Sequence, residues 1–150
     1  MSLSDTFKDQ AWVIPTSQSI HLIAISVVFV CALAIGLRLL GLIRSEQTLS
    51  MVIRRLTRLM YAGNAVLLAT GAVHIIAEPD RQLGSPAFWI KMLLIVVGLL
   101  MTYFLARSTR RDPNRWDAAD RHPATLRLYG AVYVSTWIAI IFCGRFIGYT

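Results

Sequence analysis

Four polar side chains interrupt otherwise apolar stretches of the sequence, and their spacing could bring them together. His21, His74, Lys91 and Arg145 each fall near one end of a different hydrophobic run. At a helical rise of 1.5 Å per residue, His21 lies about 9 Å inside its run, His74 about 6 Å and Lys91 about 7 to 8 Å. Ionisable groups inside hydrocarbon are costly and often mark functional sites. We therefore treat these four residues as the candidate site.

Two imidazoles at matched depth on neighbouring antiparallel helices could hold a haem iron from its two sides. His21 and His74 would be the axial ligands. The haem propionates are anionic, and three cations at this level could bind them: Lys91, Arg145 and Arg81. A bare copper or zinc ion would need a third or fourth ligand, for which only Glu78 is available. The pattern therefore favours a b-type haem over a bare ion.

Each of these residues also has a purely structural interpretation. His21 could bond a carbonyl of a neighbouring helix, and His74 could lie among lipid headgroups. Lys91 and Arg145 could extend towards water, and Lys91 could pair with Glu78. The one other histidine, His122, stands in a hydrophilic stretch, so we do not expect a second bis-histidine haem.

No catalytic residues are predicted, because the sequence contains no nucleophile–base pair, phosphate-binding loop or hydride-cofactor fingerprint. A stand-alone enzyme is therefore not favoured. The two cysteines, Cys31 and Cys143, fall inside apolar runs and are interpreted as small apolar filler.

The elements that must position the candidate site follow from composition. Of 150 residues, 56% are hydrophobic and 15% are charged, and the mean hydropathy is +0.59. Soluble domains carry about 25% charged residues, so a bilayer is the expected solvent. We predict an all-α integral membrane four-helix up-down bundle, formed by one domain over 1–150, with a short interfacial segment over 1–15. The predicted spans are about 16–43, 56–77, 86–106 and 124–144.

Basic residues are distributed unequally between the two ends of this bundle. The end with the first and third connections carries eleven: Arg38, Arg44, Arg54, Arg55, Arg58, Arg107, Arg110, Arg111, Arg115, Arg121 and Arg127. The end with the termini carries four: Lys8, Arg81, Lys91 and Arg145. Acidic residues divide equally. The positive-inside rule then predicts that both termini face outward. Topology and contact with the lipid bilayer explain the positive charge, so no nucleic acid partner is expected.

Several segments resemble an uncharacterised family of small bacterial four-helix inner-membrane proteins. These segments are SIHLIAI, LRLLGL, SPAFWIKMLLI and GRFIGY. The resemblance covers all four spans and implies the fold and a location in the bacterial inner membrane, but no activity. It marks His21, Arg38, Lys91 and Arg145 as family positions, whereas His74 falls outside the pattern. The architecture has a looser likeness to small membrane cytochromes b, which is analogy only.

Three functional hypotheses follow from these observations. The first is an electron-transfer subunit with one b-type haem near the outer face, exchanging electrons with quinol and an outer-face redox protein. The second is a non-catalytic accessory subunit of a larger membrane complex. The third is a small anion transporter or sensor that uses Lys91 and Arg145.

Overall fold

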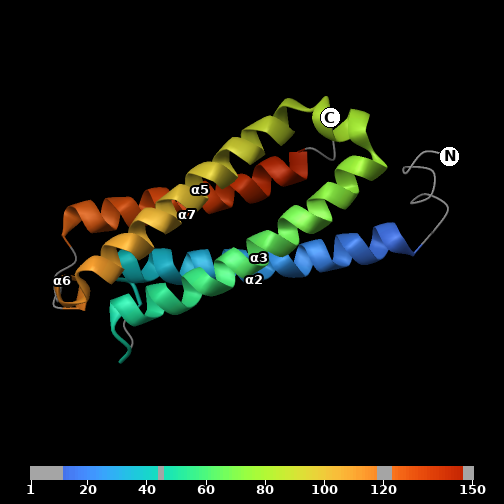
Figure 1. Ribbon diagram of the computed structural model, residues 1–150. Coiled ribbons are helices and arrows are strands. Elements are labelled where there is room, and N and C mark those ends of the chain that lie inside the picture. Colours follow the sequence, from blue (N-terminus) through green and yellow to red (C-terminus); the bar gives the residue numbers. More distant parts are fainter. Residues whose placement is uncertain (1–11, 44–45, 118–122, 147–150) are drawn as a thin grey trace.

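The computed structural model describes residues 12–43, 46–117 and 123–146, with Arg81 described by its backbone alone. Within these ranges the chain is all-α (Figure 1). Its four long helices are α2 (Val13–Leu39), α3 (Leu49–Ala77), α5 (Pro86–Arg111) and α7 (Ala124–Phe146). Two short helices connect them, α4 (Pro79–Leu83) and α6 (Pro113–Asp117). The predicted all-α fold is confirmed.

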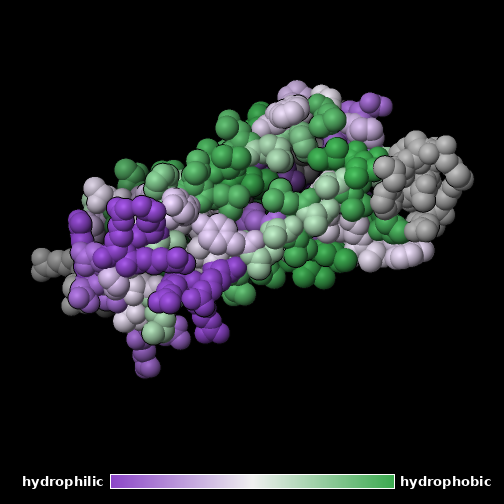
Figure 2. Space-filling view, in the orientation of Figure 1, coloured by the Kyte–Doolittle hydropathy of each residue, from purple (hydrophilic) through white to green (hydrophobic). Residues whose placement is uncertain are grey.

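All four long helices are long and apolar enough to cross a bilayer. Their most apolar windows of 18 residues have mean hydropathies of 1.6 to 2.7. Many large hydrophobic side chains point away from the bundle; Leu22 and Leu93, for example, are 63% and 64% exposed. Figure 2 shows this hydrophobic surface along the length of the helices. A soluble monomer rarely exposes so much apolar area, and the chain is a multi-pass membrane protein.

The helices are arranged as an up-down bundle, in which each long helix packs against the next along the chain and α7 closes the ring against α2. The contact between α2 and α7 is closest at Gly36 and Gly130. A Cβ on Gly130 would lie 3.1 Å from the Gly36 carbonyl oxygen and 2.9 Å from Leu39 Cβ. From this crossing the two helices diverge towards the opposite end of the bundle, at the right of Figure 1.

The two ends of the bundle are named here by their residues. The histidine end holds His21, His74 and Lys91, and lies at the right of Figure 1. The arginine end holds Arg54, Arg58 and Arg110, and lies at the left.

Several helices extend beyond the predicted spans. α3 begins at Leu49 and not near residue 56, because Leu49 and Ile53 are buried one turn apart and continue the helix through a polar stretch. α5 likewise continues to Arg111. The predicted loop after α3 contains α4. Ser85 is the N-cap of α5, and Pro86 is its first residue.

The predicted interfacial segment over residues 1–15 falls mostly outside the described residues. Its final part differs from the prediction, because α2 already begins at Val13. Pro15, the last residue of the predicted segment, lies in the first turn of α2. A proline is tolerated there because the first helical N–H groups have no partner within the helix.

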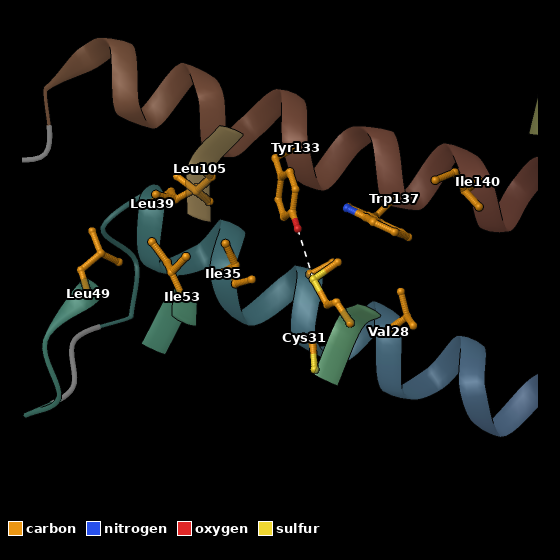
Figure 3. Close-up of a cluster of buried hydrophobic side chains, with 12 residues drawn as sticks. Val28, Cys31, Ile35, Leu39, Leu49, Ile53, Leu105, Tyr133, Trp137 and Ile140 are labelled. Carbon is orange, nitrogen blue, oxygen red and sulfur yellow. Dashed lines mark hydrogen bonds between the residues drawn. The ribbon is translucent and has the colours of Figure 1, made fainter. Parts of the chain in front are cut away.

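The largest fully buried side chain is that of Tyr133 on α7, which reaches into the centre of the bundle (Figure 3). Thr102 donates its hydroxyl proton to the Gly98 carbonyl at 2.8 Å. The Tyr133 hydroxyl can therefore donate to Thr102 Oγ1, also at 2.8 Å, and Met60 Sδ lies 3.3 Å away. One phenol thus connects α7 with α5 and α3.

This contact predicts a measurable contribution to stability. We expect Tyr133→Phe to lower the free energy of unfolding by about 1 kcal/mol, because one buried hydrogen bond is lost while Thr102 keeps its bond to its own helix. Unfolding by SDS in mixed micelles measures the change. Thr136→Val is the control, since Thr136 bonds only a carbonyl of its own helix. An equal loss in both variants would contradict a special role for Tyr133.

Candidate functional site

His21 lies where α2 packs against α3 towards the histidine end. The two helices approach closely at Gly63, where a Cβ would lie 2.6 Å from Val28 Cγ2. Two turns further along, the antiparallel register brings His21 beside Thr70 and Gly71. A Cβ at Gly71 would lie 4.0 Å from His21 Cε1, an ordinary contact distance. The His21 ring therefore lies against small residues of α3.

The hydrogen bond between His21 and Thr70 orients the imidazole. His21 Nδ1 lies 2.6 Å from Thr70 Oγ1. The threonine hydroxyl donates its single proton to the Val66 carbonyl oxygen of its own helix at 2.9 Å. With the threonine proton on that carbonyl, Nδ1 is the donor to Thr70, and we assign His21 the tautomer protonated at Nδ1. Its Nε2 keeps a lone pair, which is the form of imidazole that binds metals.

His74 lies one helical turn after Thr70, on the same face of α3. Its ring centroid is 5.2 Å from that of His21, with an angle of 59° between the ring planes. His74 Nε2 is buried and has no hydrogen-bond partner among the described residues. A buried polar atom without a partner is costly and requires an explanation. A ligand bound to this nitrogen would provide that explanation.

Lys91 brings a third helix to the site. It lies on α5 and is close enough to both imidazoles to interact with them electrostatically. Its side chain packs over Gly144 of α7, where a Cβ would lie 3.6 Å from Lys91 Nζ. The structure therefore brings together three of the four predicted polar residues, from three different helices.

The other predicted site residues lie less centrally. Arg145 is exposed in the last turn of α7. The side chain of Arg81 and the whole of His122 lie outside the described residues. Glu78 is exposed and interacts electrostatically with His74. Among the described residues, no three His, Cys, Asp or Glu side chains converge on a point that could hold a metal ion. His21 and His74 are therefore the side chains at this site that could bind a metal.

Sequence reasoning missed the residues that support this pair: Thr70, Gly71 and Gly144. Thr70 is not among the candidate site residues named from the sequence. Its spacing of four residues from His74 was an available signal, because residues four apart share a helix face. Cys143, which was interpreted as filler, is a half-buried free cysteine next to Gly144, over which Lys91 packs.

Comparison with known proteins identifies a family. Residues 8–150 match a family of unknown function (DUF6644). The chain belongs to this family. The expected membership in an uncharacterised family is thus confirmed, and DUF6644 brings no assigned activity with it. No curated protein and no solved structure matches this DUF6644 member. Any functional conclusion must therefore come from the site itself.

Proposed function

We propose that this protein is an electron-transfer subunit that holds one b-type haem at the histidine end, with His21 and His74 as axial ligands. The observation that carries the proposal is the pairing of the two imidazoles. They come from adjacent helices, and their ring centroids lie 5.2 Å apart. Because His21 uses Nδ1 for its hydrogen bond to Thr70, the lone pair on its Nε2 is available to bind a metal. A ligating histidine in a metal site almost always donates its second ring N–H in this way.

The residues at the site suit a haem in three respects. The buried Nε2 of His74 gains a partner if it binds iron. The two imidazoles come from neighbouring helices with their ring centroids 5.2 Å apart, and they would hold the iron between them. The histidine end is also the end at which α2 and α7 diverge (Figure 1).

The cations at the site would bind the propionates. Lys91 interacts with both imidazoles, and Arg145 follows Gly144 in the last turn of α7. Arg81 belongs to α4 at the same end of the bundle. When bound, the haem would supply reversible one-electron chemistry. The chain itself holds the ligands, selects the tautomer of His21 through Thr70, and surrounds the site with apolar helices.

Charge distribution supports an orientation for this site. Eleven of the fifteen basic residues belong to the arginine end, which the positive-inside rule places in the cytoplasm. The histidine end then faces outward, as do both termini, in the inner membrane of a bacterium. A haem there could exchange electrons with quinol in the bilayer and with a redox protein on the outer face.

The hydrogen bond from His21 to Thr70 provides a specific test of the ligand role. We expect Thr70→Val to lower haem affinity about 10- to 100-fold, because the imidazole loses the partner that fixes its tautomer and orientation. Haem titration of the detergent-solubilised protein, followed in the Soret region, measures the change. Thr136→Val is the matched control, since Thr136 lies on α7 and bonds only Val132 of its own helix. Unchanged affinity in Thr70→Val would exclude a ligand role for His21 in this tautomer.

A further inference from the structure

A second site lies at the opposite end of the molecule. A cleft of about 600 Å³ opens where α3 begins, α5 ends and α6 crosses between them. Four arginines line it, Arg54, Arg55 and Arg58 from α3 and Arg110 from α5. Figure 2 shows the hydrophilic surface that covers this end of the molecule, next to the hydrophobic surface of the helices.

Hydroxyl groups and one carboxylate complete the cleft. The side chains of Thr48, Ser50 and Thr109 add hydroxyl groups to its wall, and Asp117 of α6 is the single acidic residue in its lining. Both Asp117 oxygens are already engaged, one with the Ser50 backbone N–H at 3.0 Å and the other with the Ser50 hydroxyl at 2.8 Å. This carboxylate therefore caps the start of α3 and fastens α6 to it.

The arginines of the cleft consequently lack a neutralising partner within the described part of the chain. Among those residues, none of the four forms an ion pair, and the cleft carries a formal charge of +3 after Asp117 is counted. Guanidinium groups suit phosphate oxygens, because each can donate two parallel hydrogen bonds. Four guanidinium groups can therefore donate to two phosphate groups at once.

We infer that this cleft binds the headgroup of an anionic phospholipid that carries two phosphates, of the diphosphatidylglycerol class. The cleft lies at the end of the membrane-spanning helices, where phospholipid phosphates are located, and it opens between two helices whose flanks face the bilayer. Basic pockets between spanning helices are typical sites for such lipids. A soluble diphosphate offers the same headgroup chemistry but no acyl chains for these flanks. This site is independent of the haem site.

Native mass spectrometry of the full chain in mild detergent tests the inference. The probes are tetraoleoyl diphosphatidylglycerol, dioleoyl phosphatidylglycerol and inorganic pyrophosphate. We expect one diphosphatidylglycerol per chain, bound about tenfold or more tightly than phosphatidylglycerol. The double variant Arg54→Gln/Arg58→Gln should lose about tenfold in affinity for it. The control Arg107→Gln/Arg127→Gln removes the same charge from exposed arginines at the same end that do not line the cleft, and should change affinity less than about twofold.

Two results would overturn the inference. Equal losses in both double variants would show that the lipid responds to general surface charge and not to the cleft. Pyrophosphate binding as tightly as the lipid would identify a soluble diphosphate as the ligand. The four arginines substituted in the two double variants are all exposed, so both variants should fold. Their unfolding midpoints without added lipid check this directly.

Discussion

If the protein binds haem as proposed, we expect His21→Ala and His74→Ala each to reduce haem content from about one per chain to less than about 0.1. This is the largest effect that we expect, because a bis-histidine iron loses half of its protein ligands in either variant. The imidazoles belong to different helices, so neither residue can replace the other. Haem content per chain, measured by the pyridine haemochrome assay after purification in detergent, gives the result.

The third histidine of the chain provides the control for these variants. His122→Ala removes an imidazole outside the proposed site and should keep the full haem content. A fluorescence-detected size-exclusion profile that matches the unsubstituted protein confirms that each variant is folded. Full haem retention in either His21→Ala or His74→Ala would contradict the assignment of that residue as a ligand.

Gly130→Ala produces the second large effect, on the fold and not on the site. A methyl group at this position would lie 2.9 Å from Leu39 Cβ, 3.1 Å from the Gly36 carbonyl oxygen and 3.2 Å from the Leu40 nitrogen. Two of these three atoms are backbone and cannot rotate away, so α2 and α7 must separate. We expect a loss of about 2 to 3 kcal/mol in the free energy of unfolding, typical of overpacking. Unfolding by SDS in mixed micelles measures it.

Gly71→Ala is the matched control for this substitution. Its methyl group would meet only His21 Cε1, at an ordinary contact distance of 4.0 Å. Both substitutions gain helix propensity equally, by up to about 1 kcal/mol. The difference between the two variants therefore isolates the close approach at Gly130. Equal stability of the two variants would show that α2 and α7 do not cross at Gly36 and Gly130.

The bundle could be predicted because hydropathy and helix length are local properties of the sequence. Each apolar run marked one spanning helix, and short connections placed neighbours side by side. The helix ends were less predictable, since hydropathy marks the bilayer-crossing part of a helix and not its full length. Leu49 and Ile53 continue α3 by packing against other helices, which a hydropathy window over the arginine-rich stretch does not detect.

The proximity of the two histidines and Lys91 was predictable from the sequence, but the residues around them were not. Depth along each helix brought His21, His74 and Lys91 to one level, because depth depends only on residue number and helical rise. The partnership of His21 with Thr70 depends in addition on the register and facing of α2 and α3. Close packing at Gly63 and Val28 fixes that register, and no local pattern in the sequence specifies it. Lys91 packing over Gly144 depends in the same way on the pairing of α5 with α7.

The visible spectrum of the purified protein tests the central claim most directly. The protein is produced in haem-replete cells, purified in mild detergent and measured first oxidised and then reduced with dithionite. The haem account predicts a Soret band that shifts on reduction, with resolved α and β bands, at about one haem per chain. A colourless protein would contradict the account. Its purification within a stoichiometric larger complex would then favour an accessory subunit.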